Sequence, residues 1–335
     1  MKFNKRNLLV TGGAGFIGSN FISFLLNKYK SINIVNLDLL TYAGSIKNMK
    51  SFYSNSNHKF IEGDICDQKI VVDIFNKYNI DGVINFAAES HVDNSIKNPD
   101  IFIKSNINGV INLLNIAYSF WMHKPFKLKE KYKHARFHQI STDEVYGSIE
   151  KGSFNENSRY APNSPYSASK ASADLLVRSY QKTYGLNTSI SICSNNFGPN
   201  QHREKFFPKV IDSLVNNKPI PVYGDGKNIR DWIYVENHCK AIDLIFNNSK
   251  PGSIYNIGGE FELTNLELIE LIYKKLNTKI DINKRIQFIN DRYGHDFRYS
   301  LNIKKIKNEL GWKTIKDFDK NTDNYINLLL NKKSL

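Results

Sequence analysis

The sequence predicts an α/β protein, in which a doubly wound parallel sheet is followed by a smaller C-terminal α/β lobe. Short apolar, β-branched runs alternate with helical patterns through the first part of the chain, which is typical of a parallel sheet covered by helices on both faces. A glycine-rich turn joins the first run to the first helical pattern. Beyond about residue 195 the predicted strands are shorter and loops are more frequent.

Six apolar runs predict the strands of the large sheet, and four helical patterns accompany them. The strands are expected at 7–11, 32–38, 59–62, 82–87, 136–141 and 188–193. The helices are expected at 17–29, 70–78, 101–120 and 166–184. Ser164 is a suitable N-cap for the last helix, and Pro165 suits its first position.

The second part of the chain predicts a smaller lobe packed against the sheet. Its strands are expected at 219–223, 254–257 and 286–289. A helix is expected at 265–275, beginning after Thr264. No linker rich in glycine and serine separates the two parts. We therefore expect a first domain at 1–195 and a second lobe at 196–335, with a soft boundary and some exchange of chain between them.

The chain is basic, with 46 lysine and arginine residues against 32 aspartate and glutamate residues and a net charge of +14. The basic residues are spread along the sequence, and no helix-turn-helix, RNP or zinc-finger signature accompanies them. Nucleic acid is therefore not expected as a partner. A cluster of lysines at 124–133 is interpreted as a solvated insertion.

The three cysteines, Cys66, Cys193 and Cys239, are far apart and lack the spacing of metal ligands. This pattern predicts neither a disulfide framework nor a bound metal, and a reducing cytoplasm is the expected location. No apolar run approaches the ~18 residues of a membrane helix, so no membrane association is expected.

Gly12, Gly15 and Gly18 follow the first predicted strand and open the first predicted helix. In this context the first glycine allows a tight turn, the second lets the backbone approach a pyrophosphate, and the third lets helix and strand pack closely. The helix N-terminus then faces the phosphates. The sequence therefore predicts a dinucleotide site of the Rossmann type.

Asp38 ends the second predicted strand, twenty residues after Gly18, and predicts which dinucleotide binds. A carboxylate in this position accepts hydrogen bonds from the ribose hydroxyls and repels a 2′-phosphate, so NAD is favoured over NADP. Asp64 and Ile65 follow the third strand and are expected to contact the same cofactor.

Tyr166 and Lys170 are four residues apart on a predicted helix, so their side chains project from one face. A free phenol has a pKa of about 10, but a nearby ammonium and an oxidised nicotinamide would lower the pKa of Tyr166. Tyr166 could then take the proton of a substrate alcohol while hydride leaves the same carbon. The pair indicates reversible oxidation of an alcohol.

Several motifs together resemble the extended short-chain dehydrogenase/reductase superfamily. They lie at 11–18, 86–93, 141–147, 166–170, 194–199, 223–232 and 294–296. Within the superfamily the chain is similar to the nucleotide-sugar 4,6-dehydratases. The resemblance implies NAD as cofactor, with further contacts from Phe16, Ile17 and Ala87, and dTDP-glucose as the nucleotide-diphosphate sugar substrate. It also implies a homodimer that pairs the helices at 101–120 and 166–184.

Asp143 and Glu144 favour a dehydratase, because the epimerases of the superfamily keep the surrounding motif but lack this acidic pair. By resemblance, Tyr166 and Thr142 act on the C4 hydroxyl of the sugar. Glu144 then removes the C5 proton, and Asp143 protonates the departing C6 hydroxyl. Asp143 must be neutral near pH 7 while Glu144 is ionised, and adjacent carboxyls in a closed site can differ in this way. The product would be a 4-keto-6-deoxy sugar, the usual precursor of deoxysugars such as rhamnose.

Basic residues of the second lobe are candidates to grip a diphosphate, because arginine binds phosphate through paired hydrogen bonds. The candidates are Lys205, Arg230 and Arg298, and the resemblance adds Asn196 and Asn265. It also places Pro221 and Tyr223 near the base, and Ser90, His91 and Asp93 beside the sugar.

Two residues depart from the common family pattern. Phe297 stands where the family commonly has an arginine, which leaves Arg298 as the phosphate candidate, and Phe197 replaces a usual tyrosine. Both changes leave the nucleotide preference open.

Alternatives of two classes remain. A UDP-sugar 4,6-dehydratase or a nucleotide-sugar 4-epimerase would use much of the same site, with a decarboxylase further behind. A non-catalytic NAD- or RNA-binding protein could be built on the same fold, because fold alone does not establish activity. The complete set Thr142, Asp143, Glu144, Tyr166 and Lys170 argues against the non-catalytic alternative.

Overall fold

The computed structural model describes residues 6–278 and 280–331. Its largest element is an all-parallel sheet with the strand order β12-β8-β7-β4-β1-β2-β3. The strands are β1 (Asn7–Thr11), β2 (Asn33–Asp38), β3 (His58–Glu62), β4 (Gly82–Asn85), β7 (Arg136–Thr142), β8 (Thr188–Cys193) and β12 (Ser253–Ile257). Most of their side chains are buried, as expected of a parallel sheet covered on both faces.

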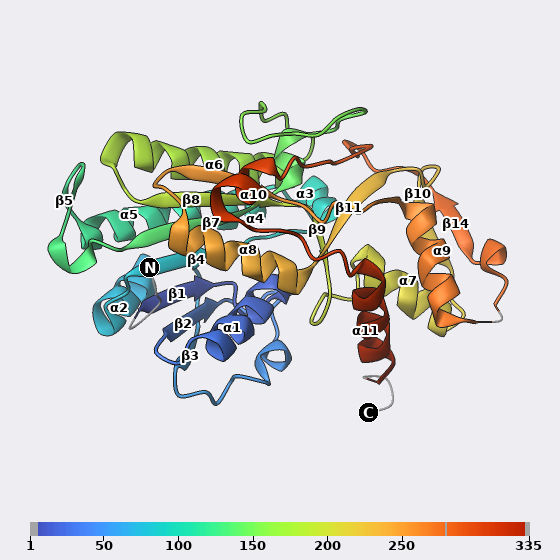
Figure 1. The fold of residues 1–335 in the computed structure, drawn as a ribbon, viewed down its shortest axis with the longest axis horizontal. Helices are drawn as coiled ribbons and strands as arrows, with labels where there is room; N and C mark the ends of the chain where they lie inside the picture. Colours follow the sequence, from blue (N-terminus) through green and yellow to red (C-terminus); the bar gives the residue numbers. More distant parts are fainter. Residues whose placement is uncertain (1–5, 279, 332–335) are drawn as a thin grey trace.

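Helices cover both faces of this sheet (Figure 1). On one face lie α1 (Phe16–Lys28) and α8 (Val235–Asn248), which share an apolar core with the sheet. On the other face lie α2 (Gln68–Tyr78), α5 (Gly109–Trp121) and α6 (Pro165–Tyr184). The predicted doubly wound fold is therefore confirmed, with strand bounds within a few residues of those expected.

The local sequence explains where α6 begins and ends. The Ser164 side chain accepts a hydrogen bond from the backbone N–H of Ser167, whose hydroxyl accepts one from the Ser164 backbone N–H. Pro165 occupies the first helical position, and Gly185 ends the helix with φ of 72°. The predicted N-cap and first-position proline are confirmed, and the reciprocal bond with Ser167 satisfies a second backbone donor at the start of the helix.

The predicted long helix before β7 is not regular. A short helix α4 (Asp100–Phe102) leads into a π-helical segment η2 (Ile103–Asn108), and α5 begins only after it. Asn106 of η2 accepts a hydrogen bond from the backbone N–H of Glu89 and donates one to Ser169 on α6. π-helical turns are rare and often occur at functional sites. Helical periodicity did not reveal this one, because its stabilising bonds come from distant segments.

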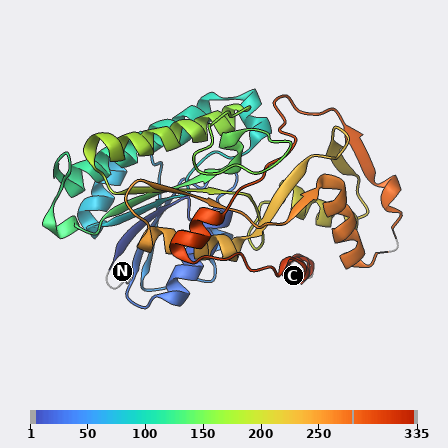
Figure 2. The ribbon, with the colours of Figure 1, turned by 45° about the horizontal axis from the view of Figure 1, so that its top comes forward.

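The C-terminal lobe lies to one side of the sheet (Figure 2). Its strands form two small sheets, and its helices pack around them. They are β9 (Asn195–Phe197), β11 (Ile229–Tyr234) and β13 (Glu262–Thr264); β10 (Ile220–Tyr223) and β14 (Ile286–Ile289); and α7 (Phe206–Val215), α9 (Asn265–Leu276) and α11 (Phe318–Asn331). Phe197 is fully buried in this lobe and stacks on Phe207 at a ring distance of 4.8 Å. A phenyl ring in place of the usual tyrosine therefore serves the apolar core.

Two elements cross the expected boundary near residue 195. Strand β12 lies beside β8 as the edge strand of the large sheet, and α8 packs against α1. Residues of the second part of the chain thus complete the sheet and the helical layer of the first part. The assignment of cofactor binding to 1–195 and of substrate binding to 196–335 stays a prediction.

The remaining elements are short. They are α3 (Val92–Lys97), α10 (Lys304–Leu310), the hairpin of β5 (Met122–Lys124) and β6 (Lys127–Leu128), and the 3₁₀ turns η1 (Ile46–Met49), η3 (Glu130–Tyr132), η4 (Asp143–Tyr146) and η5 (Ile282–Lys284). Most lysines of the segment 124–133 face solvent, in agreement with a solvated insertion. Within residues 6–278 and 280–331, no helix has the length and apolarity needed to cross a membrane.

Candidate active site

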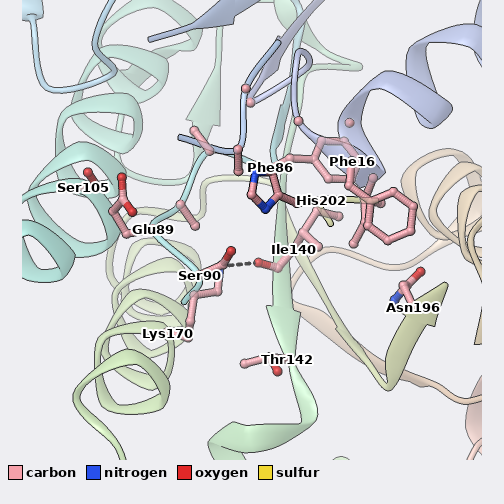
Figure 3. Close-up of a pocket in the computed structure, with 18 of the residues that line it drawn as sticks. Phe16, Phe86, Glu89, Ser90, Ser105, Ile140, Thr142, Lys170, Asn196 and His202 are labelled. Carbon is pink, nitrogen blue, oxygen red and sulfur yellow. Dashed lines mark hydrogen bonds between the residues drawn. The ribbon is translucent and has the colours of Figure 1, made fainter. Parts of the chain in front are cut away.

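A pocket opens where the carboxyl ends of the parallel strands meet the C-terminal lobe (Figure 3). Its volume is about 360 Å³, within the range of small-molecule sites. Ligands of doubly wound folds bind at this edge of the sheet.

The glycine turn between β1 and α1 forms one end of the pocket. Gly12 has φ of 69°, and a Cβ there would lie 2.6 Å from the backbone nitrogen of Ala87. A Cβ at Gly18 would lie 2.3 Å from the carbonyl oxygen of Gly12. Gly15 is the N-cap of α1 and supplies no capping side chain, so the helix N-terminus can receive an anion. Phe16 and Ile17 line the same part of the pocket.

Asp38 lies beside this turn and fits the ribose of a dinucleotide. Its two carboxylate oxygens accept hydrogen bonds from the backbone N–H groups of Ala14 and Leu40, each at 2.8 Å. Asp38, Asp64, Ile65 and Ala87 all line the pocket. The glycines, where a side chain would meet neighbouring backbone, and the fixed carboxylate of Asp38 together fit NAD.

Thr142, Asp143, Glu144, Tyr166 and Lys170 line the middle of the pocket, and we call these five residues the floor. Strand β7 ends at Thr142, and η4 begins with the two acids. Lys170 on α6 donates a hydrogen bond of 2.6 Å to the Ile140 carbonyl on β7, which fixes helix to strand at this point (Figure 3). Local structure therefore brings together residues from two separate motifs.

The two acids of the floor differ in electrostatic environment. Asp143 is 3% exposed, and burial together with the neighbouring Glu144 charge raises its pKa well above the usual value. Burial also raises the pKa of Glu144, but the charges of Arg292, Arg230 and Lys205 oppose the rise. Asp143 thus keeps its proton to higher pH than Glu144 does, which is the order that the sequence-based mechanism requires.

The pKa of Tyr166 departs from the sequence-based expectation. Burial, followed by the charge of Glu144, raises it well above the ordinary value, while a hydrogen bond with Thr142 lowers it. The protein groups alone therefore do not produce the lowered pKa that was expected. The positive charge of an oxidised nicotinamide is the remaining source of stabilisation for a phenolate.

Three of the predicted substrate residues, Ser90, Asn196 and Lys205, line the pocket. Asn196 lies across the pocket from Lys170 (Figure 3). The other seven are absent from its described lining: His91, Asp93, Pro221, Tyr223, Arg230, Asn265 and Arg298. Tyr223 instead donates a hydrogen bond of 3.2 Å to Asp93, which connects β10 to α3.

Arg230 and Arg298 are held differently, although both were predicted to bind phosphate. Arg230 donates to the carbonyl oxygens of Asp296 and Phe297, and its charge acts on both acids of the floor. Arg298 makes a paired ion bridge with Glu262 at 2.7 and 2.8 Å. Arg298 is thus engaged in an ion pair within the protein and does not line the pocket.

Arg292 is the basic residue that the sequence interpretation missed. Among the described groups it contributes the largest charge effect that lowers the pKa of Glu144. Its Nε atom is buried and has no hydrogen-bond partner within the described residues. Arg292 lies in the segment 291–299, which also contains Phe297 and the predicted phosphate ligand Arg298. We call Lys205, Arg230 and Arg292 the cation group.

Comparisons with known proteins agree with this geometry. The family model of GDP-mannose 4,6 dehydratase matches residues 9–324. The chain is 44% identical over 318 residues to a dTDP-glucose 4,6-dehydratase of Xanthomonas campestris pv. campestris, covering 93% of this chain and 89% of that one. It is 46% identical over 306 residues to the low-salt glycan biosynthesis protein Agl12 of Haloferax volcanii, covering 91% and 93%.

One similar solved structure is that of DesIV, a dTDP-glucose 4,6-dehydratase from Streptomyces venezuelae, determined with NAD bound. It superposes with a TM-score of 0.90 at 39% identity, and the match covers 98% of each chain. The resemblance stated from the motifs therefore extends to the whole described fold.

Proposed function

This chain belongs to the GDP-mannose 4,6 dehydratase family, and we propose that it converts dTDP-glucose to dTDP-4-keto-6-deoxyglucose and water. One observation carries the proposal: Asp143 and Glu144 lie together at the end of β7 in the pocket, beside Tyr166 and Lys170. An epimerase needs only to oxidise C4 and to return hydride to it. A dehydratase also needs an acid and a base for the loss of water, and this pair can supply both.

NAD is the cofactor that the glycine turn and Asp38 would hold, and when bound it supplies a hydride acceptor for C4 and a hydride donor for C6. Asp64, Ile65 and Ala87 would border it. Because oxidation and reduction cancel over one turnover, the cofactor can stay bound, and we propose a hydro-lyase with tightly held NAD.

The residues of the floor divide the proton transfers between them. Tyr166 takes the proton of the C4 hydroxyl, and Thr142 holds the same oxygen. The C4 ketone makes the C5 proton acidic, and Glu144 removes it. Asp143 gives its proton to the C6 hydroxyl, which leaves as water and creates a C5–C6 double bond. Hydride is then added at C6, and Glu144 returns its proton to C5. The proton that Tyr166 took from the C4 hydroxyl is released and replaces the one that Asp143 gave to the departing water, so each group regains its starting form.

The diphosphate of the substrate would lie near the cation group, with Asn196 on the same side. Lys205 lines the pocket directly and donates a hydrogen bond of 3.2 Å to the Ser90 carbonyl. We propose Arg230 and Arg292 as phosphate ligands ahead of Arg298, because their charges act on Glu144 whereas Arg298 pairs with Glu262. Charge-assisted hydrogen bonds of this kind are among the strongest in proteins.

We further propose a homodimer formed through the helical segments at 100–121 and 165–184. Large apolar side chains there are exposed, including Leu175 at 54% and Ile103 at 47%. Burial of such side chains against a second copy would remove them from water.

A reducing cytoplasm remains the proposed location, in keeping with three free cysteine thiols.

The deciding experiment offers dTDP-glucose and UDP-glucose separately to the purified protein and identifies the sugar product. We expect a 4-keto-6-deoxy sugar from dTDP-glucose, formed without net consumption of NAD. Preference for UDP-glucose would replace the proposed substrate but keep the reaction. An unchanged or epimerised hexose from both substrates would contradict the proposal.

A further inference from the structure

Asp174 lies one helical turn beyond Lys170 on α6 and takes no part in the steps described above. Tyr166, Lys170 and Asp174 are spaced by four residues, so they follow one another along the same side of the helix. Their exposed fractions are 9%, 5% and 1%. Burial of an isolated carboxylate is costly unless its charge is compensated. The position of Asp174 behind the active lysine therefore calls for a physical reason.

The carboxyl group of Asp174 is held from one side only. Ser141, at the start of the acidic motif on β7, donates a hydrogen bond of 2.5 Å to Oδ2. Tyr160 donates a second bond of 3.3 Å to the same oxygen. Oδ1 is buried and has no hydrogen-bond partner among the described residues. The group is thus fixed in place and keeps one oxygen available.

Lys170 is the complementary case. Its ammonium group has three N–H donors. Within the described part of the chain it uses one of them, in the bond of 2.6 Å to the Ile140 carbonyl. A buried ammonium with spare donors therefore lies one turn from a buried carboxylate with a spare acceptor.

We infer that Asp174 is a positioning residue, whose buried carboxylate provides the counter-charge that keeps Lys170 in the ammonium form behind Tyr166. The consequence for turnover rests on the proposed function of Tyr166. The charge state of Lys170 itself can be measured without turnover.

The other groups that face this pair do not supply the same charge. Burial lowers the pKa of Lys170, and the two groups that oppose this are Asp174 and Cys193. Burial raises the pKa of the Cys193 thiol to about 12, so this thiol is neutral near pH 7. The pKa of Asp174 is about 6, raised by burial and lowered again by Ser141, Lys170 and Tyr160. Asp174 is therefore largely ionised near pH 7.

Two further groups border the site from neighbouring elements. Burial raises the pKa of Tyr146 in η4, and the charge of Asp174 adds to this rise, so the phenol stays neutral. Arg178, one turn further along α6, acts on Tyr160 and is not among the groups that shift Lys170. Neither residue replaces Asp174 as a counter-charge.

The test compares Asp174→Asn with the unmodified protein, both carrying isotope-labelled lysine side chains for NMR titration. Lys170→Arg identifies the signal of Lys170. Without the carboxylate, burial is unopposed, so Lys170 should lose its proton at a pH lower by about one pH unit or more. An unchanged titration of Lys170 in Asp174→Asn would overturn the inference.

Tyr160→Phe is the matched control, because it removes one hydrogen bond to Asp174 but keeps the charge and the ring. The titration of Lys170 should stay unchanged in this variant, and a shift as large as that of Asp174→Asn would assign the effect to packing and overturn the inference. If Asp174→Asn does not fold, the unmodified protein decides the matter. An ammonium retained up to about pH 8 supports the inference, and a neutral amine at about pH 7 contradicts it. If the protein does not dehydrate dTDP-glucose, the proposed function is wrong. A measured shift in the titration of Lys170 would still support the inference about Asp174.

Discussion

The floor and the cation group hold their charges in different ways. The floor residues are bound to neighbours in the same strand and helix. Three of the five come from β7 and η4 and two from α6, and Asp143, Tyr166 and Lys170 are buried. The cation group comes from the C-terminal lobe. Lys205 and Arg292 are half-buried, whereas Arg230 is buried and is fixed by backbone carbonyls of a distant loop. Burial is the largest cause of the raised pKa of both acids. For Asp143 the charge of Glu144 adds to the rise, whereas for Glu144 the charges of all three members of the cation group oppose it. Proton transfer in one region thus depends on side chains of the other.

The largest expected effect comes from removing the base of the floor. Glu144→Gln keeps size and hydrogen-bonding capacity but cannot accept the C5 proton. Turnover should fall by roughly 10²–10⁴-fold, the usual contribution of a general base. Exchange of the C5 proton with deuterated solvent should stop, while binding of the nucleotide sugar persists.

Asp143→Asn is the matched control for this variant, because it removes the acid and leaves the base. It should still allow exchange at C5 while loss of water is impaired. Continued exchange of the C5 proton in Glu144→Gln would show that another group is the base, and it would contradict the roles proposed for the two acids.

The pH dependence of turnover tests the same contrast without mutation. Because the pKa of Glu144 is raised, the acid limb should lie above its ordinary value of 4.5, with activity falling as pH decreases through it and Glu144 gains a proton. Activity should fall again at high pH as Asp143 loses its proton, since its pKa is raised further. Each limb should approach a tenfold loss per pH unit, about the slope of a single titration. A profile that is flat from about pH 4 to 9 would contradict the assignment.

A smaller effect is expected from the cation group. Arg292→Gln removes a charge that stabilises the ionised form of Glu144, so the acid limb should move to higher pH. Loss of one charge-assisted contact to a diphosphate should also lower kcat/KM by about tenfold or more.

Arg298→Gln provides the comparison, because Arg298 is paired with Glu262 and is not among the charges that lower the pKa of Glu144. We expect less than a threefold change in kcat/KM and no shift of the acid limb, since partly exposed ion pairs contribute roughly 1 kcal/mol or less. A larger effect for Arg298→Gln than for Arg292→Gln would restore the original choice of phosphate ligand.

The smallest effect is expected from the helix caps. The Thr264 side chain accepts a hydrogen bond from the Glu267 backbone N–H at the start of α9, and Ser164 does the same for Ser167 in α6. Each change to alanine should lower the free energy of unfolding by about 1 kcal/mol. Only Ser164→Ala should also reduce turnover, because α6 carries floor residues. Equal activity of the two variants, measured with their denaturant midpoints, would contradict this distinction.

Much of the site could be predicted because its parts are local in sequence. Gly12, Gly15 and Gly18 occupy one turn, and Tyr166 with Lys170 occupy one helix face, so the chain itself fixes their distances. The placement of Arg298 could not be predicted in this way. It depends on Glu262, which lies 36 residues earlier.

Contacts between segments distant in sequence also could not be predicted. The strand at 254–257 was expected, but its membership of the large sheet depends on pairing with β8 across some sixty residues of chain. The π-helical segment η2 is stabilised by bonds to the Glu89 backbone and to Ser169, which no helical periodicity encodes. Sequence patterns describe each element, but they do not choose its distant partner.

The position of β12 has a consequence for the synthesis of the protein. While the ribosome is making this chain, β8 has no neighbour on its outer side until residues 253–257 have emerged. An incomplete chain would expose an unpaired strand edge next to the catalytic residues, and such edges promote aggregation. The nascent protein therefore needs most of its length before the sheet is closed, so a truncated N-terminal half should not be a usable smaller version of this enzyme.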